Sequence, residues 1–268
     1  KVALVTGGAR GLGRAYALRL ARLGADVGII DINLRSFEEF EREKREMSGE
    51  TVIRELENLG VRASGVEADV CDASQVEKAV QTIAAELGDI DILVANAGGG
   101  IGSHFGSRAS ELDPEQLRKV MERNFYGTVY TVRAVAPMMK RKRYGKIVTV
   151  ASVLGLQSNA EGSFADYGAA KGAIVRYTEF LAQDLGPYNI TVNAIAPGFI
   201  GTGRILDTVD MQGQALEEVR ENIALGRIGT TEDCAKVVEF LTTRLSDYVT
   251  GAVIPVSGGF RYGAKSNA

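Results

Sequence analysis

The stretch that decides the fold is VALVTGGARGLGRAYALRLARLG, residues 2–24. It opens with a β-branched and aliphatic run, passes through a glycine-rich turn and then repeats apolar residues at spacings of three and four. This order predicts a buried strand, a tight turn and an amphipathic helix that ends at Gly24. Such a turn brings backbone N–H groups and the positive end of a helix dipole against a phosphate. We therefore expect a pyrophosphate site formed by Gly7, Arg10, Gly11, Leu12 and Gly13.

Strand and helix patterns alternate along the rest of the chain. The predicted strands are Val2–Thr6, Asp26–Ile30, Arg62–Glu67, Ile90–Ala95, Lys146–Val150, Ile190–Ile195 and Ala252–Val256. The predicted helices are Leu12–Leu23, Ser74–Leu87, Pro114–Met139, Ala165–Leu185 and Glu232–Leu245. Alternation of this kind requires right-handed crossovers, which build a parallel sheet with helices on both faces. We expect an α/β, doubly wound, Rossmann-like fold, and because no linker-like stretch interrupts the pattern, one domain over residues 1–268.

Composition narrows the class of protein. The 268 residues carry a net charge of −3, and their basic residues are scattered apart from a cluster at 140–143, so we expect no nucleic-acid partner. That cluster follows a predicted helix, where positive charge is favourable. The two cysteines are far apart and lack metal-ligand spacing, which predicts no metal site and favours the reducing cytoplasm. No apolar run approaches the length of a membrane span, so we expect neither a membrane nor a secreted protein.

Two residues bear on the choice of dinucleotide. Asp31 ends the second strand 20 residues after Gly11 (31 − 11), where a carboxylate accepts hydrogen bonds from the adenosine ribose and repels a 2′-phosphate. Arg10 favours the opposite choice, because a guanidinium in the glycine turn could pair with that phosphate. Because the Asp31 carboxylate would directly repel a 2′-phosphate, we give it more weight than Arg10 and expect NAD as the cofactor. The next segment, residues 34–50, mixes both charge signs densely and is interpreted as a solvated helical face or loop in preference to a partner surface.

Polar and small residues follow the third and fourth strands. Asp69 and Val70 could contact the adenine edge through a carboxyl and a backbone N–H, although Asp69 could instead cap the next helix. Asn96, Ala97 and Gly98 would let the chain pass close to a ribose or to nicotinamide, or could form only a loop.

A phenol and an ammonium group lie on one helical face. Tyr167 and Lys171 are four residues apart in a predicted helix. A phenol with an ordinary pKa near 10 is a poor base at neutral pH, and a neighbouring cation stabilises its phenolate. Ser152 follows the fifth strand and would converge on the same edge of the sheet, where its hydroxyl can hold a substrate oxygen. Each residue alone has an ordinary structural explanation, and the combination predicts general acid/base chemistry.

Together these motifs make the chain resemble the classical short-chain dehydrogenase/reductase family over nearly its whole length. The matching pieces are Thr6-Gly7-x-x-x-Gly11-x-Gly13, Asp69, Asn96-Ala97-Gly98, Asn124, Ser152, Tyr167-x-x-x-Lys171, Pro197-Gly198 with Thr202, and Ser257-Gly258-Gly259. The resemblance implies a seven-stranded sheet and a catalytic set of Ser152, Tyr167 and Lys171, with Asn124 holding a water that links Lys171 to solvent. It also implies that Pro197, Gly198, Ile200 and Thr202 approach the nicotinamide, that Tyr167 and Lys171 help to bind it, and that the protein is a homotetramer with contacts through its two long helices.

The sequence departs from the family pattern in two places. The connection at residues 33–50 is longer than usual, and Ala95 stands where a second asparagine often precedes the Asn96 motif. Neither change removes a catalytic group. The first bears on the shape of the surface beside the cofactor.

Substrate identity depends on three loops at residues 99–105, 154–164 and 199–211. Their apolar residues are Ile101, Phe105, Leu154, Leu156, Phe164, Phe199 and Ile205, and their polar candidates are Gln157, Asn159 and His104. A largely apolar pocket of this kind favours a small-molecule secondary alcohol or ketone as substrate, with NAD as cofactor. His104, the only histidine, is interpreted as an ordinary loop residue. Two alternatives remain: an NADPH-dependent 3-oxoacyl reductase of the same family, and a catalytically idle NAD-binding sensor.

Overall fold

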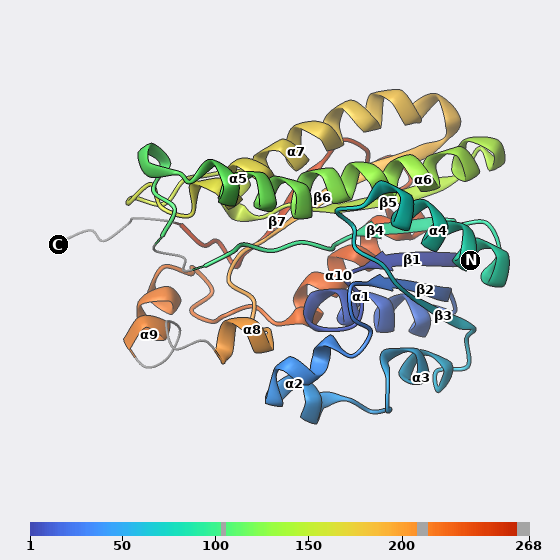
Figure 1. Cartoon of the computed structure of the whole chain (residues 1–268), viewed down its shortest axis with the longest axis horizontal. Helices are drawn as coiled ribbons and strands as arrows, with labels where there is room; N and C mark the ends of the chain where they lie inside the picture. The colour runs from blue at the N-terminus through green and yellow to red at the C-terminus, as the bar shows by residue number, and fades with distance from the viewer. Residues whose placement is uncertain (103–105, 208–213, 262–268) are drawn as a thin grey trace.

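A computed structural model describes residues 1–102, 106–207 and 214–261 and contains one seven-stranded sheet (Figure 1). The strands are β1 (Val2–Thr6), β2 (Asp26–Asp31), β3 (Ala63–Glu67), β4 (Ile92–Ala95), β5 (Gly145–Val150), β6 (Ile190–Pro197) and β7 (Val253–Val256). Their order is β3-β2-β1-β4-β5-β6-β7, and every neighbouring pair is parallel. The predicted doubly wound sheet is confirmed, and no strand boundary differs from its prediction by more than two residues.

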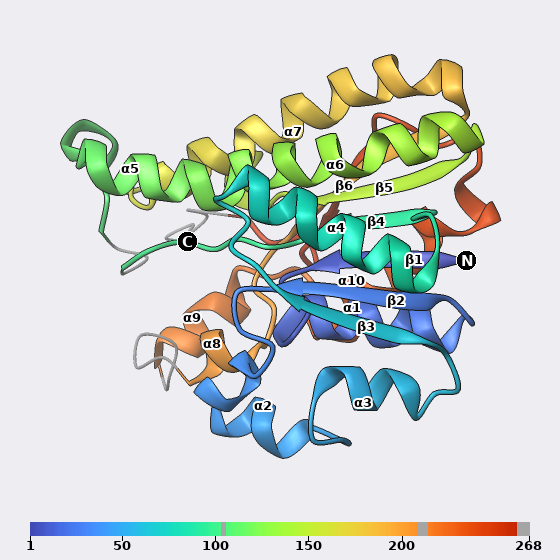
Figure 2. The same ribbon diagram turned by 45° about the vertical axis from the view of Figure 1, so that its right-hand side comes forward.

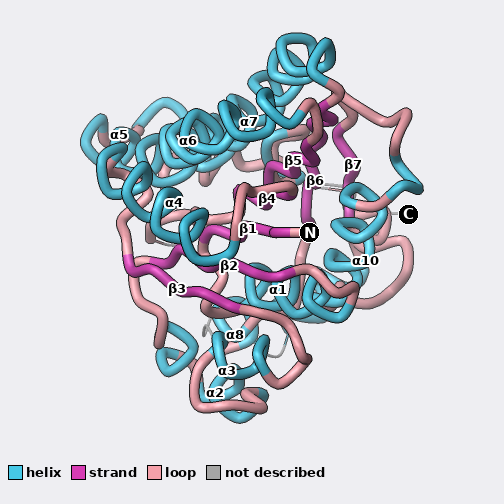
Figure 3. The backbone as a smooth tube through the Cα atoms, turned by 90° about the vertical axis from the view of Figure 1, so that its right-hand side faces the viewer, coloured by secondary structure: helices cyan, strands magenta, loops and turns pink. Residues whose placement is uncertain are grey.

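Helices cover both faces of this sheet (Figure 3). The α-helices are α1 (Gly11–Arg22), α2 (Glu41–Glu46), α3 (Val52–Glu57), α4 (Ala73–Leu87), α5 (Pro114–Met121), α6 (Gly127–Lys142), α7 (Ala165–Leu185), α8 (Gly203–Leu206), α9 (Gln214–Glu221) and α10 (Thr231–Thr242). One core cluster joins the sheet to α4, α6 and α7, and a second joins it to α1, α3 and α10. Burial on two faces explains why β1 is largely apolar and why β1 and β5 are buried throughout, although β5 also contains Lys146, whose ammonium group pairs with Asp247.

The chain is helical over the whole predicted range Pro114–Met139, but it is not α-helical throughout. A turn of π-helix at Glu122–Tyr126 separates α5 from α6. Such bulges insert one extra residue per turn and often occur at functional sites. Here the bulge carries Asn124, whose side chain is completely buried.

The charged segment, residues 34–50, is also more buried than its sequence indicated. It forms a short 3₁₀ turn over Ser36–Glu39 followed by α2, and α2 lies against α8 (Figure 2). Ser36, Phe37 and Glu43 are each only 4% exposed. The interpretation of this segment as a solvated face was therefore wrong for these three residues, because the segment packs against the glycine turn and α8 instead of projecting into solvent.

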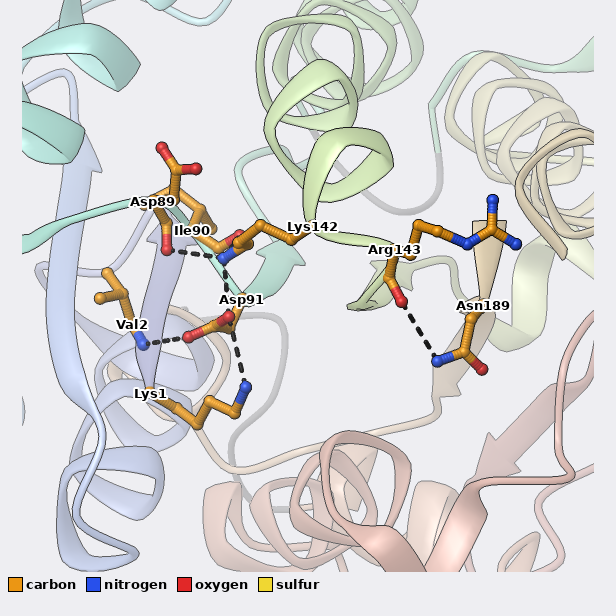
Figure 4. Close-up of polar contacts among 8 residues, drawn as sticks. All are labelled: Lys1, Val2, Asp89, Ile90, Asp91, Lys142, Arg143 and Asn189. Carbon is orange, nitrogen blue, oxygen red and sulfur yellow. Dashed lines mark hydrogen bonds and ion pairs between the residues drawn. The ribbon is translucent and has the colours of Figure 1, made fainter. Parts of the chain in front are cut away.

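The basic cluster at 140–143 ends α6, as its charge predicted, and its side chains are engaged within the chain. Lys142 Nζ donates 2.7 Å to a carboxylate oxygen of Asp91 and also bonds the carbonyls of Asp89 and Ile90 (Figure 4). Lys140 pairs with Asp184, and Arg141 with Asp89. The contacts of Arg141 and Lys142 join the end of α6 to the loop before β4, and the contact of Lys140 joins it to α7.

Three further findings concern the described residues. Their helices include none that is both long enough and apolar enough to cross a bilayer. Cys71 and Cys234 are free thiols. Within the same residues, no group of three side chains could hold a metal ion.

Candidate active site

A cavity of about 610 Å³ opens at the carboxyl edge of the sheet, where ligands bind in folds of this kind. The predicted cofactor residues that line it are Gly7, Arg10, Gly11, Leu12, Gly13, Asp31, Asp69, Val70, Asn96, Ala97, Gly98, Tyr167, Lys171, Pro197, Gly198, Ile200 and Thr202. Ser152 lines it as well. The structure thus brings all of these residues to one cavity, and of the predicted catalytic and cofactor-binding residues, all of which the structure describes, only Asn124 does not line it.

The glycine turn is shaped by very close backbone approaches. A Cβ atom on Gly13 would lie 2.0 Å from the carbonyl oxygen of Gly7, so no larger residue fits there. Gly11 has φ +54°, and a Cβ atom on it would meet its nearest neighbours, Glu43 and Thr202, only at 3.5–3.6 Å. The side chain of Asn96 supports the turn from below by donating to the carbonyls of Thr6 and Gly7. This open cradle of backbone fits a diphosphate.

Asp31 is held rigidly at one end of the cavity. Its Oδ2 accepts from the Ala9 N–H at 3.0 Å, and its Oδ1 accepts from the Asn33 N–H at 3.2 Å. Burial raises the pKa of Asp31, and these backbone hydrogen bonds counteract part of that effect. Asp69, nearby, is not the cap of α4, because Asp72 caps that helix through the N–H groups of Ser74 and Gln75.

Arg10 does not point freely into the cavity. Its guanidinium lies 3.5 Å from the Glu39 carboxylate and 4.8 Å from the centre of the Phe40 ring. Both partners come from the charged segment. The expectation that Arg10 could pair with a 2′-phosphate did not include these two partners.

Tyr167 and Ser152 meet inside the cavity. Tyr167 lies near the start of α7, and Ser152, two residues after the end of β5, is 8% exposed. Burial raises the pKa of Tyr167 to about 12, although its hydrogen bond with the Ser152 hydroxyl and the nearby positive charge of Arg204 act in the opposite direction. The pair can hold an oxygen atom between two hydroxyl groups.

Lys171 lies one helical turn beyond Tyr167 and is 3% exposed. Its Nζ donates 2.7 Å to the Val150 carbonyl, at the end of β5. Burial lowers the pKa of Lys171 to about 7. The anchored ammonium is therefore easily deprotonated, which suits a group that passes protons.

Asn124 is placed behind Gly98 by the π-helical turn. Its Nδ2 donates to the carbonyls of Gly99 and Val120, and its Oδ1 accepts from the Gly99 N–H. A Cβ atom on Gly98 would lie 2.5 Å from Asn124 Oδ1 and 3.4 Å from Lys171 Nζ, so Gly98 separates the two side chains at close range. The side chain of Asn124 fixes the loop that follows β4.

The segment after β6 forms the opposite wall. Ile200 bridges to Gly229, and the Thr202 N–H donates 2.8 Å to the Ile200 carbonyl. The N–H of Gly203 donates 3.0 Å to Glu43 Oε1. The charged segment therefore holds both the glycine turn and the start of α8.

The predicted substrate residues separate into three groups. Leu154, Phe164, Phe199 and Ile205 line the cavity, whereas Ile101, Leu156, Gln157 and Asn159 do not. Of these four, Leu156 is 44% exposed, and the side chain of Asn159 hydrogen-bonds Ser163. His104 and Phe105 lie outside the described residues.

Sequence reasoning missed two arginines in the cavity wall, Arg123 and Arg204. Arg204 Nη2 donates 2.6 Å to the Gly100 carbonyl, which spans the cavity from α8 to the loop after β4. Burial lowers the pKa of Arg204. The only sequence signal for it was its position two residues after Thr202.

Comparison with known proteins gives the family. Residues 7–261 match the family model described as enoyl-(acyl carrier protein) reductase. A cyclohexanol dehydrogenase from Rhodococcus sp. (strain TK6) is 51% identical over 98% of this chain and 96% of its own length. The chain belongs to the short-chain dehydrogenase/reductase family. It is therefore an oxidoreductase of a family that works with nicotinamide dinucleotides.

Two further members of the family match the chain over nearly its whole length. A 3-oxoacyl-[acyl-carrier-protein] reductase from Aquifex aeolicus (strain VF5) is 38% identical over 97% of this chain and 96% of its own length. The crystal structure of a 3-oxoacyl-[acyl-carrier protein] reductase with bound NAD, from Brucella melitensis, superposes with a TM-score of 0.83 at 33% identity. It covers 98% of this chain and 92% of the other.

Proposed function

We propose that this short-chain dehydrogenase/reductase is a cytoplasmic, NAD-dependent enzyme that interconverts secondary alcohols, cyclic ones in particular, and their ketones. One observation carries the proposal: Ser152 and Tyr167, with Lys171 one helical turn away, line the same cavity that ends at the Asp31 carboxylate. The residues that can transfer a proton and the glycine turn that can hold a diphosphate therefore line the same cavity.

The residues of the site divide the chemistry among them. In the oxidation direction Tyr167, as phenolate, removes the hydroxyl proton of the alcohol while the Ser152 hydroxyl holds the same oxygen. The bound dinucleotide supplies the hydride acceptor at its nicotinamide ring. Lys171 stabilises the phenolate with its charge and returns the proton toward solvent. Reduction of a ketone uses the same groups with the phenol as the acid.

The choice of NAD rests on charge at the adenosine end. Asp31 is buried and fixed by two backbone N–H groups, so it cannot swing away from a 2′-phosphate. A carboxylate beside a phosphate in a partly desolvated site is strongly unfavourable. Arg10, the nearest candidate counter-charge, is paired with Glu39.

The substrate proposal rests on the walls and on one relative. Leu154, Phe164, Phe199 and Ile205 give the substrate end an apolar character that suits a hydrocarbon ring. The cyclohexanol dehydrogenase that is 51% identical acts, by its name, on such a ring. A compact cyclic alcohol would bury its ring against these walls and present its hydroxyl to Tyr167.

The test is to follow reduced nicotinamide by absorbance with NAD or NADP and a panel of cyclic, linear, aromatic and steroidal secondary alcohols. We expect turnover with NAD on cyclic alcohols. Tyr167→Phe should lower kcat by about 10³-fold and change NAD affinity less than about threefold. Tyr177→Phe removes a partly buried hydroxyl from the same helix outside the cavity and should retain full activity. Tight NAD binding without turnover on any alcohol or ketone would favour the sensor instead, and a preference for NADP would favour the 3-oxoacyl reductase.

A further inference from the structure

We infer that Arg204 binds a carboxylate on the substrate, so that the enzyme acts on cyclic secondary alcohols that carry an acid group and on the matching ketones. The inference rests on the proposed function, because it narrows the substrate class of the same site. It assigns a ligand to a guanidinium for which the acid/base chemistry of the site supplies none.

The guanidinium of Arg204 is held against the loop that follows β4. Its Nη2 donates 2.6 Å to the Gly100 carbonyl. Its Nη1 lies beside Gly99, because a Cβ atom built on that glycine would come within 2.6 Å of it. A guanidinium carries five N–H donors in one plane, and within the described part of the chain Arg204 makes only the bond to Gly100. Arg204 is half-buried and lines the cavity, so donors remain for a ligand.

Arg204 also has no counter-charge from the parts of the protein that the structure describes, where no carboxylate lies within 4 Å of it. Three other partly covered arginines do have such partners: Arg10 pairs with Glu39, Arg14 with Glu55, and Arg19 with Glu232 and Glu239. Burial, together with the positive charges of Arg10 and Arg123, lowers the pKa of Arg204. A carboxylate ligand would offset these effects and accept charge-assisted hydrogen bonds from the guanidinium.

Arg204 lies near the point where the reacting hydroxyl is expected. The Phe164 ring packs on Gly100, since a Cβ atom on that glycine would fall 2.0 Å from the ring. The centre of the same ring is 4.9 Å from the centre of the Tyr167 ring. Although burial raises the pKa of Tyr167, the nearby charge of Arg204 acts against that rise. Guanidinium, aromatic ring and phenol thus follow one another along the cavity wall, an order that suits the carboxylate, ring and hydroxyl of one compact molecule.

The dinucleotide brings a second anion, its diphosphate, into the same cavity. The glycine turn between Gly7 and Gly13 offers that diphosphate backbone N–H groups at the start of a helix. Arg204 is instead tied to the loop after β4, close to the phenol. We therefore assign Arg204 to the substrate, and the experiment measures NAD binding to separate the two anions.

The kinetic experiment compares cyclohexanol with the positional isomers of hydroxycyclohexanecarboxylate and with their methyl esters, at saturating NAD. For at least one isomer we expect kcat/KM to exceed that of cyclohexanol and that of its own ester about 30-fold, the effect of one hydrogen-bonded charge. Arg204→Met should abolish this preference, and Arg204→Lys, which keeps the charge, should retain part of it. Arg220→Met removes an exposed arginine of α9 and should leave the preference unchanged.

A binding measurement separates this inference from the proposed function. Cyclohexanecarboxylate has no hydroxyl to oxidise, so its calorimetric titration into the full chain with NADH bound reports on Arg204 without turnover. We expect Arg204→Met to weaken this binding at least about tenfold and to change NAD affinity less than about threefold. Arg204-dependent binding without turnover on any alcohol would count against the dehydrogenase activity alone.

Two results would overturn the inference. One is the absence of any preference for an acid over its ester, which would show that the site does not recognise the charge. The other is an equal loss of NAD and carboxylate affinity in Arg204→Met, which would identify the diphosphate as the anion that Arg204 binds.

Discussion

The Nζ atom of Lys171 lies 5.5 Å from the centre of the Tyr167 ring, one helical turn along α7. Burial acts on the two groups in opposite directions, raising the pKa of Tyr167 to about 12 and lowering the pKa of Lys171 to about 7. Near neutral pH the phenol of Tyr167 is therefore protonated in the protein alone, while Lys171 is divided between its charged and neutral forms. Phenolate becomes accessible only when positive charge is held beside it, from Lys171 and from an oxidised nicotinamide.

This relationship predicts how alcohol oxidation depends on pH. Oxidation needs the deprotonated phenol, so kcat/KM for the alcohol should rise with pH through the lower pKa that Tyr167 has beside an oxidised nicotinamide and level off above it. Lys171→Met removes a cation that favours phenolate, which should move the midpoint upward by at least about one pH unit. Initial rates measured across the stable pH range give the midpoint. Lys171→Arg keeps a cation and should shift it less, whereas an unchanged midpoint in Lys171→Met would contradict a charge role for Lys171.

Arg204 should tune the same phenol from the opposite wall. Its charge lowers the pKa of Tyr167, and its side chain bonds the Gly100 carbonyl across the cavity. We expect Arg204→Met to raise the midpoint of the oxidation profile and to increase KM for the alcohol severalfold, because both the cation and the bridge are lost. The matched variant Arg220→Met removes an exposed arginine of α9 that pairs with Glu217, and it should change neither quantity. A lower KM with an unmoved midpoint would instead indicate that Arg204 obstructs the site.

The fold and much of the site were predictable because they depend on local patterns. A buried parallel strand is recognisable because most of its residues are apolar. The spacing of Gly7, Gly11 and Gly13 indicates a tight turn in which side chains would clash or strain the backbone. The four-residue spacing of Tyr167 and Lys171 is likewise a property of one helix.

The remainder depends on contacts between segments far apart in the chain. Glu43 looks like a surface residue in a highly charged stretch, yet it is buried because the Gly203 N–H donates to it across 160 residues of sequence. Arg204 enters the cavity only because α8 packs against α2. The π-helical turn that carries Asn124 has no local signature, since its residues also continue an α-helical pattern.

The two long helices offer a surface for assembly. Phe180 on α7 is 69% exposed, and Tyr126, the last residue of the π-helical turn before α6, is 44% exposed. The resemblance to the family implies a homotetramer with contacts through these helices, and exposed aromatic residues are typical of such interfaces. We expect sedimentation to show a tetramer and Phe180→Glu to shift it toward smaller species. Leu23→Glu changes an exposed apolar residue at the end of α1 and should leave the assembly intact. A wild-type monomer would contradict the prediction.

A buried ion pair between Arg14 and Glu55 contacts Ser48 and so holds the charged segment in place. Substitution of Glu55 therefore tests how much this pair stabilises the fold. Arg14 donates two hydrogen bonds to the Glu55 carboxylate, at 2.6 and 2.7 Å, and Ser48 donates two more to Glu55 Oε1. Burial alone would raise the pKa of Glu55, but the hydrogen bonds from Arg14 and Ser48 outweigh it and lower that pKa.

Glu55→Gln should therefore reduce the free energy of unfolding by about 3 kcal/mol at neutral pH, because it leaves the Arg14 charge without its partner. Since the folded-state pKa of Glu55 is lowered, its contribution is present above the unfolded-state pKa and is lost as pH falls through the folded-state value. The difference between wild type and variant in urea unfolding should shrink in acid accordingly. Glu57→Gln, which breaks the exposed pair with Arg54, should cost less than about 1 kcal/mol. Equal losses for the two variants at neutral pH would show that the Arg14 pair does not anchor the segment.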